Sequence, residues 1–300
     1  MPSEQSELAA SFRHCRAVAR RHARSFYFSS FALPPRKRAA AYAVYAFCRH
    51  ADDTIDVACE QDCGAKAEAL GRLEREFAAI MAGDHRALPF AAAFAETVER
   101  YRIPERYFGE LIHGVGLDVG RVRIADWPQL RDYCYYVAAV VGLIMARVFG
   151  LDDDDRDGEA RAIDLGIAMQ LTNIIRDVAE DYQRDRVYLP SDELAGAGVG
   201  EAELAAPTAG AALRGLIAAQ IGRARAHYRA CEPGIRRLDR DGSQLTVWTM
   251  RHVYAGILDE VESADCDVLR GRAATSFGRK LRLALRAWRD CRRQPETGGA

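Results

Sequence analysis

Two groups of acidic and amide side chains recur at helical spacing in this chain. The outer acids of each group stand four residues apart, so on a helix they lie on one face, one turn above another. Like charges at this spacing destabilise a helix by about 0.2 to 0.5 kcal/mol per pair, so a bound cation should offset the repulsion. The two rows are Asp52, Asp53 and Asp56, and Asn173, Asp177 and Asp181.

These rows carry the hard oxygen ligands that magnesium prefers, and magnesium commonly bridges one or two carboxylates to substrate phosphates. Apolar stretches at 39–51 and 162–172 precede them, so each row is expected to continue a buried helix, where acids need partners. The sequence therefore predicts a metal-bridged diphosphate site, with a solvated acidic face as the alternative. A third acidic run, 152–155, follows Gly150 without an apolar frame and is predicted to be a solvated loop.

Composition excludes several other classes of function. With 42 basic and 43 acidic residues the net charge is −1, so nothing in the overall charge favours nucleic acid. The eight cysteines form no CxxC pairs and are read as free thiols, with Cys59 and Cys63 as a weaker metal-binding alternative. No leader and no bilayer-length apolar run is evident, which predicts a cytoplasmic protein, with membrane association limited to its surface.

The elements that position the rows are expected to be helices throughout. Nearly every segment between Pro or Gly breaks has helical periodicity, and strand-like alternation is hard to find, which predicts one all-α domain over residues 1–300. The expected helices cover 5–30, 35–57, 64–82, 89–101, 104–120, 127–149, 157–183, 201–205, 208–231, 243–262 and 277–293.

Aromatic and basic residues gather in the segments that carry the rows. Nine aromatic residues are expected either to pack in the core or to line a channel for a hydrocarbon cation. They are Phe26, Tyr27, Phe28, Tyr42, Tyr45, Phe47, Tyr133, Tyr135 and Tyr136. Arginines beside the rows are suited to the non-metal oxygens of a diphosphate, or to surface ion pairs. They are Arg24, Arg49, Arg176, Arg184 and Arg186.

The chain resembles the squalene and phytoene synthase family over about residues 22–280. The segments that carry the resemblance appear in family order: HARSFYFSSFALPP, YAVYAFCRHADDTID, LIHGVGLDV, LRDYCYYVAAVVGLIM, QLTNIIRDVAEDYQRDRVYLP and VYAGILDEV. The resemblance implies the all-α class I isoprenoid synthase fold, with a central cavity between antiparallel helices. One departure is Ala139, which stands where the family often has glycine and is expected to make the cavity wall bulkier.

The resemblance also assigns roles to individual residues. It implies that Asp52, Asp56, Asn173, Asp177 and Asp181 bind metal, and that residues 184–190 form a flap over the site. The four aspartates are catalytic, together with Tyr133 and Tyr188. The substrate-binding set it implies is His22, Arg24, Ser25, Tyr45, Arg49, Gln170, Asn173, Tyr254 and Arg272.

The implied reaction is a head-to-head condensation of two allylic prenyl diphosphates through a cyclopropylcarbinyl diphosphate. Mg²⁺ would be the cofactor, with Mn²⁺ as a substitute. The favoured product is phytoene from two geranylgeranyl diphosphates. The alternative is presqualene diphosphate, dehydrosqualene or squalene from farnesyl diphosphate, with NADPH needed only for squalene.

Two other classes of protein are weighed. A terpene cyclase is expected to have Ser and Glu ligands in its second metal motif, whereas this chain reads N-x-x-x-D-x-x-x-D. A non-catalytic helical scaffold is disfavoured because no metal ligand is missing. The partners are therefore prenyl diphosphates and not nucleic acid, and the oligomeric state is open.

Two further expectations concern the ends of the fold. The helix expected at 277–293 places Phe277, Leu281 and Trp288 on one face with basic residues around it, so it either packs on the bundle or touches an anionic membrane. Near the other end, Ser30 is expected to lie deep in the cavity, beyond Phe26, where it leaves room for a long prenyl tail.

Overall fold

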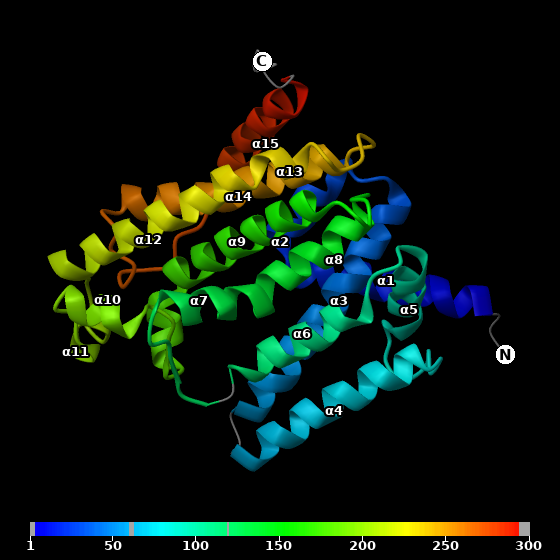
Figure 1. Ribbon diagram of the computed structural model, residues 1–300, viewed down its shortest axis with the longest axis horizontal. Coiled ribbons are helices and arrows are strands. Elements are labelled where there is room, and N and C mark those ends of the chain that lie inside the picture. The colour runs from blue at the N-terminus through cyan, green and yellow to red at the C-terminus, as the bar shows by residue number, and fades with distance from the viewer. Residues whose placement is uncertain (1–3, 60–62, 119, 294–300) are drawn as a thin grey trace.

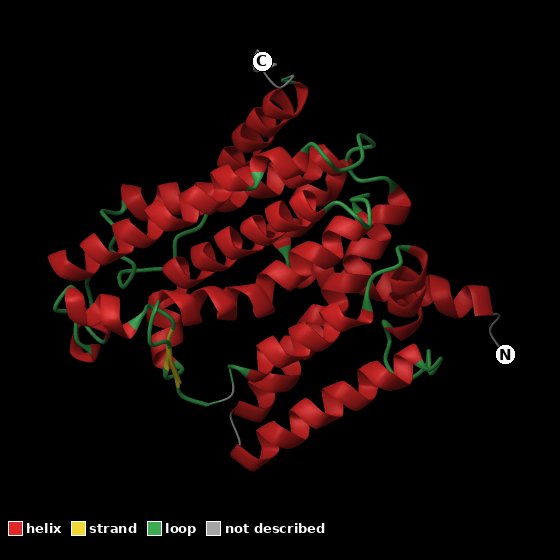
Figure 2. Cartoon of the chain, viewed as in Figure 1, coloured by secondary structure: helices red, strands yellow, loops and turns green. Residues whose placement is uncertain are grey.

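Helices build almost the whole of this computed structural model, which describes residues 4–59, 63–118 and 120–293 (Figure 2). Across those ranges the strands are limited to two short segments that pair in parallel, Val122 with Arg186 and Arg123 with Val187. The predicted all-α class is therefore confirmed.

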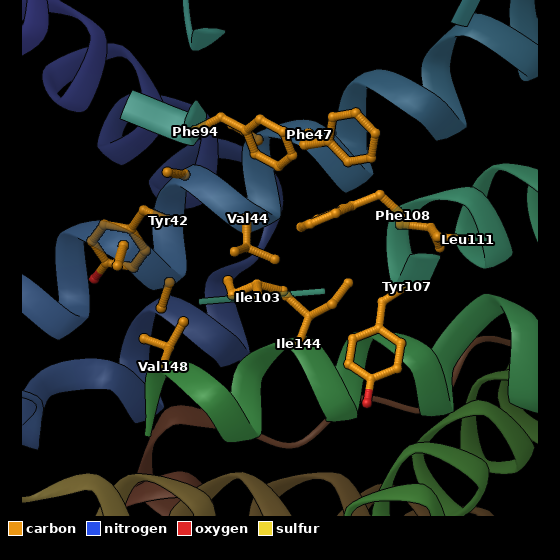
Figure 3. Packing of buried hydrophobic residues seen from close by; sticks show 14 of the residues in the cluster. Tyr42, Val44, Phe47, Phe94, Ile103, Tyr107, Phe108, Leu111, Ile144 and Val148 are labelled. Carbon is orange, nitrogen blue, oxygen red and sulfur yellow. The ribbon is translucent and has the colours of Figure 1, made fainter. Parts of the chain in front are cut away.

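The N-terminal half packs the helix that carries the first acidic row against its neighbours. Phe47 stacks on Phe94 with ring centroids 4.6 Å apart, and Phe108 meets Phe94 edge-on at 4.9 Å, which fixes α3 against α5 and α6 (Figure 3). The elements of this half are α1 (Glu4–His22), α2 (Arg24–Ser29), the 3-10 turn η1 (Ser30–Ala32), α3 (Pro35–Cys59), α4 (Cys63–Met81), α5 (Ala91–Arg100) and α6 (Glu105–Gly116).

In the C-terminal half, α9 lies against both α12 and α14, and α15 packs on α14 and projects at the edge of the molecule (Figure 1). The elements are β1 (Val122–Arg123), α7 (Trp127–Cys134), the π-helical turn η2 (Tyr135–Ala139), α8 (Val140–Val148), α9 (Arg156–Gln183), β2 (Arg186–Val187), α10 (Ser191–Gly196), α11 (Glu201–Leu204), α12 (Ala211–Ala230), α13 (Glu232–Ile235), α14 (Ser243–Ser263) and α15 (Phe277–Arg292).

The acidic run 152–155 before α9 is a loop with three exposed aspartates, as expected, and it also makes contacts that hold α9 in place. The Asp155 carboxylate accepts a hydrogen bond from the Gly158 amide at 2.9 Å and so caps the N-terminus of α9. Asp153 accepts from the guanidinium of the buried Arg147, also at 2.9 Å. Asp154 remains exposed.

The helix expected at 127–149 contains a π-helical turn, η2. Close backbone contact accompanies it on two sides: a Cβ on Gly166 of α9 would lie 2.4 Å from the Ala139 Cα, and one on Gly114 of α6 would lie 2.8 Å from the Tyr136 carbonyl carbon. A single π turn inside a helix often marks a functional site. Here it lies beside the cavity described below.

The described residues bear on two expectations, that no segment spans a membrane and that the cysteines are free thiols. No helix there is long and apolar enough to cross a bilayer. The thiols of Cys15, Cys48, Cys134, Cys231, Cys266 and Cys291 are free. The side chains of Cys59 and Cys63 lie outside the part of the chain that can be described.

Candidate active site

The first acidic row lies on α3 and its members point to different partners. Asp52 opens onto the central cavity. Asp53 accepts from the Arg49 Nε at 3.0 Å. Asp56 accepts from Arg186 at 3.1 Å, so the segment that follows α9 reaches back to the first row.

The second row lies on α9. Asn173 faces the cavity and donates to the Gln170 side chain at 3.3 Å. Asp177 accepts from the Nε atoms of Arg176 at 2.7 Å and Arg272 at 2.8 Å. Hydrogen bonds to the charged form favour it, so although partial burial raises the pKa of Asp177, the two arginines hold it below its usual value.

A carboxylate outside the two rows, Asp118, lies close enough to both for its charge to act on Asp52 and on Asp181. It accepts from the hydroxyls of Tyr188 at 2.6 Å and Tyr133 at 3.1 Å, and the two tyrosine rings stack with centroids 4.8 Å apart. Asp118 follows α6 and has no acid four residues away, so the helical spacing used above gives no signal for it. Its segment, LIHGVGLDV, contributed to the family resemblance, but the residue itself was missed.

These carboxylates bring several negative charges close together at the polar end of the cavity. Burial, with the charge of Asp118 as the next contribution, raises the pKa of Asp52 to about 7. Burial together with the charge of Asp177 raises the pKa of Asp181 to about 7, and burial also raises the pKa of Asp118. Desolvation and like charges both disfavour the ionised form, so the site is prepared for a cation.

An apolar cavity of about 370 Å³ leads away from the acids. Along α9 its lining extends from Asn173 to Gly158, which corresponds to about 22 Å at 1.5 Å per residue. Its polar end is formed by His22, Tyr45, Asp52, Gln170, Asn173 and Tyr254. Elsewhere its walls are mainly aliphatic side chains of η2, α8, α9, α13 and α14.

The structure does not bring every expected substrate-binding residue to this cavity. The cavity is lined by His22, Tyr45, Gln170, Asn173 and Tyr254, and also by Phe26. Arg49 and Arg272 do not line it and pair with Asp53 and Asp177 instead. Arg24 and Ser25 do not line it either. Arg24 is exposed, and Ser25 offers its carbonyl to the Ser29 hydroxyl. The physical reason is a break at Ala23, where φ −124° and ψ 55° end α1 and turn the chain into α2.

Two expectations about the cavity wall are wrong. Ser30 does not line the cavity, because its hydroxyl is buried against the Tyr42 hydroxyl at 2.6 Å. Ala139 does not add bulk to the wall either. It is fully buried against Gly166 of α9, and Ala138 faces the cavity instead.

The expected flap at 184–190 is held in place by several contacts. β2 pairs with β1, and Arg123 bridges Asp185 at 2.7 Å and Glu201 at 2.8 Å. The segment brings Arg186 to Asp56 and Tyr188 to Asp118. It therefore closes one side of the acidic site.

Comparison with known proteins agrees with this arrangement. The squalene/phytoene synthase family model matches residues 19–279. The chain belongs to the squalene and phytoene synthase family. It is accordingly a prenyltransferase with the class I isoprenoid synthase fold, as the resemblance implied.

The relatives in this family include both phytoene and squalene-type enzymes. Phytoene synthase 3 of Zea mays is 36% identical, with 94% of this chain and 66% of the maize protein covered. The 15-cis-phytoene synthase of Synechocystis is 34% identical, with 96% and 88% covered. Among solved structures, a dehydrosqualene synthase in complex with ligand has a TM-score of 0.86 and 29% identity, covering 94% of this chain and 97% of that one. Squalene synthase HpnC from Alicyclobacillus acidocaldarius has a TM-score of 0.76 and 28% identity, covering 87% and 96%.

Proposed function

We propose that this protein condenses two geranylgeranyl diphosphates head to head to form phytoene, with Mg²⁺ as its cofactor. The observation that carries the proposal is the apolar cavity that extends about 22 Å along α9 from the acidic rows. An extended carbon chain advances about 1.25 Å per single bond of about 1.52 Å, so the 16-carbon main chain of a C20 tail spans roughly 19 Å. The 12-carbon main chain of a C15 tail spans roughly 14 Å.

The donor set fits magnesium bound together with diphosphate. The residues that would hold it are Asp52, Asp56, Asn173, Asp177 and Asp181, all of which offer oxygen ligands. Among the described residues no three carboxylates, thiols or imidazoles are grouped closely enough to hold an ion alone. Diphosphate oxygens and water would therefore complete the coordination, as is usual for Mg²⁺.

Held by these residues, Mg²⁺ would supply Lewis-acid chemistry to the leaving diphosphate. Arginines at the mouth of the cavity can hold the remaining oxygens, because Arg186 and Arg272 now pair with carboxylates that metal binding would occupy. The Tyr133 and Tyr188 hydroxyls donate to Asp118, and burial raises their pKa values well above the usual one. As neutral phenols they would hold Asp118 in place. The aliphatic walls exclude water from the allylic cation.

Farnesyl diphosphate is the second candidate substrate, which would lead to dehydrosqualene, presqualene diphosphate or squalene. The observation in its favour is the close likeness to a dehydrosqualene synthase, at a TM-score of 0.86. NADPH would be required only for squalene. Cavity length and the phytoene synthases among the relatives favour the C20 substrate.

The test is incubation of the purified protein with C15 and C20 diphosphates, separately and in competition, with Mg²⁺ and with or without NADPH. The expected product is phytoene, formed without NADPH and preferred in competition. Asp52→Asn and Asp177→Asn should each lower turnover about 10³-fold, a loss of roughly 4 kcal/mol of charge stabilisation. The exposed Asp154 provides the matched control, Asp154→Asn, which should retain turnover. Formation of C30 products alone would overturn the choice of substrate, and active Asp52→Asn and Asp177→Asn proteins would overturn the metal model.

A further inference from the structure

One face of α15 exposes a continuous apolar stripe. Phe277, Leu281, Leu285 and Trp288 are 68%, 46%, 61% and 43% exposed. Their spacing of four, four and three residues places them on one side of the helix over about 17 Å. Large apolar side chains exposed together in this way mark an interaction surface.

The opposite face of α15 fixes the orientation of this stripe. Ala287 is fully buried, and Leu283 lies so close to α14 that a Cβ on Gly256 would be 2.7 Å from its Cδ1 atom. Arg279 bridges Asp259 at 2.9 Å and Glu260 at 3.0 Å. The helix is therefore packed on the bundle as one expectation had it, while its apolar stripe still points outward.

The stripe continues onto the segment that closes the cavity. The Phe28 ring meets the Phe277 ring at 6.1 Å and the Phe31 ring at 6.3 Å, and Phe31 is 56% exposed. Phe26, two residues before Phe28, lines the cavity. We call the outward set the docking face: Phe28, Phe31, Phe277, Leu281, Leu285 and Trp288.

Positive charge surrounds the docking face, although the whole chain has a net charge of −1. Beside the stripe, Arg282, Arg286 and Arg289 are exposed, and the described residues place no carboxylate within ion-pair distance of Arg282 or Arg289. Arg292 lies over the Trp288 ring at 4.0 Å. Burial, and then the charge of nearby Arg24, lower the pKa of Lys280. The one acidic residue of α15 is Asp290, and its carboxylate oxygen lies 2.9 Å from the Nε2 atom of His252.

We propose that the docking face binds an anionic lipid surface, with α15 lying in the interfacial plane. An apolar stripe flanked by arginines on a helix too short and too charged to cross the bilayer is the pattern that binds this way. Basic residues attract anionic headgroups, and the phenylalanines, leucines and tryptophan enter the acyl boundary. Phe26 of α2 lines the cavity and Phe28 of the same helix belongs to the docking face, so α2 would lie between lipid and a hydrocarbon product, if the reaction is as proposed above.

The test is co-flotation of the full chain with vesicles of phosphatidylcholine alone or mixed with phosphatidylglycerol. Wild-type protein should float with the mixed vesicles, much less with phosphatidylcholine, and less as salt rises. Leu285→Ser with Trp288→Ser, and separately Arg282→Glu with Arg286→Glu, should each lower the bound fraction more than tenfold. Circular dichroism should show unchanged helix content.

Matched controls place the same changes elsewhere. Arg131→Glu with Arg229→Glu makes the same charge change on α7 and α12, and Leu117→Ser removes an exposed apolar side chain outside the docking face. Both controls should float like wild type. Equal flotation of all variants, or none by wild type, would overturn the proposal. So would a concentration-dependent dimer that Leu285→Ser with Trp288→Ser abolishes, since the face would then bind a second copy. Binding needs no turnover, so this result is independent of the reaction proposed above.

Discussion

At the scale of residues, the electrostatics of the site depend on Asp118, a carboxylate that belongs to neither acidic row. The charge of Asp118 contributes to the high pKa of Asp52, and the Tyr188 and Tyr133 hydroxyls stabilise that charge. Each tyrosine donates one hydrogen bond, and each such bond favours the ionised form of the carboxyl. Asp118 therefore controls how much negative charge the metal-free site can hold.

Asp118→Asn should lower the pKa of Asp52, because removal of a nearby negative charge makes ionisation of Asp52 easier. Burial persists, so the pKa of Asp52 should stay above its ordinary value. Carbon-detected NMR titration of the metal-free protein would measure it. A second variant, Tyr188→Phe, should raise the pKa of Asp118, because the charged form of Asp118 loses a hydrogen bond. An unchanged Asp52 titration in Asp118→Asn would show that the two carboxyls do not interact.

At the scale of elements, η2 depends on a close approach between helices. Gly166→Ala should lower the free energy of unfolding by about 1 to 3 kcal/mol, because its Cβ would lie 2.4 Å from the Ala139 Cα. Gly222→Ala on α12 is the matched control, with nothing within 4 Å of the added Cβ. There the same change should raise stability by about 0.5 to 1 kcal/mol. Urea unfolding would measure both, and a stabilised Gly166→Ala protein would contradict the packing described.

The contact between α14 and α15 should depend on pH through His252. Burial and then the charge of Arg251 lower the pKa of His252 to about 4, although Asp290 at 2.9 Å opposes the shift. Between pH 6.5 and 4 the unfolded chain therefore binds a proton that the native His252 does not. The free energy of unfolding should fall by about 3 kcal/mol from this group as pH drops across that window.

His252→Gln should remove that part of the pH dependence. Chemical unfolding of both proteins at several pH values between 4 and 7 would provide the comparison. The difference between the two curves isolates His252 from the carboxyls that titrate in the same range. Parallel curves would mean that Asp290 offsets burial and the charge of Arg251, so that the pKa of His252 is the same in the native and the unfolded protein.

Much of the fold was predictable because helical periodicity and Pro or Gly breaks are local signals. The ends of α3, α9 and α14 lie within two residues of the expected ones. The break at Ala23 and the π turn η2 were not predictable, because neither is marked by Pro or Gly at the break and η2 lies against backbones distant in sequence. The error at Ser30 followed directly, since it assumed that the first helix continued past Ala23.

The candidate site shows the same division between local and tertiary signals. The rows on α3 and α9 were visible because their members repeat at four-residue spacing. The role of Asp118 could not be predicted from sequence spacing, because only the tertiary fold brings it to Tyr133 and Tyr188. The placement of Arg24 outside the cavity also depends on tertiary structure.

At the scale of the whole molecule, the length of the cavity along α9 should limit the length of the prenyl tail that the protein accepts. Ala162 lines it eleven residues from Asn173, or about 17 Å, which lies between the spans of C15 and C20 tails. Ala162→Phe should therefore reduce turnover of the C20 substrate relative to C15 about 5- to 150-fold, corresponding to roughly 1 to 3 kcal/mol of overpacking. Competition between the two diphosphates would measure the ratio. Ala160→Phe, at an exposed position on the same helix, should leave the ratio unchanged.

The arginine pairs at the cavity mouth have a consequence for how the two ligands meet. Arg186 and Arg272 are ion-paired with Asp56 and Asp177. With the ligands proposed above, Mg²⁺ would have to displace these arginines from the carboxylates, and diphosphate would draw the same arginines away. Binding of either Mg²⁺ or diphosphate would therefore help to break the arginine–carboxylate pairs that oppose binding of the other. Binding of the two should be positively coupled, and the coupling must be reciprocal. The protein would then respond to the product of two concentrations, and remain nearly empty when either ligand is scarce.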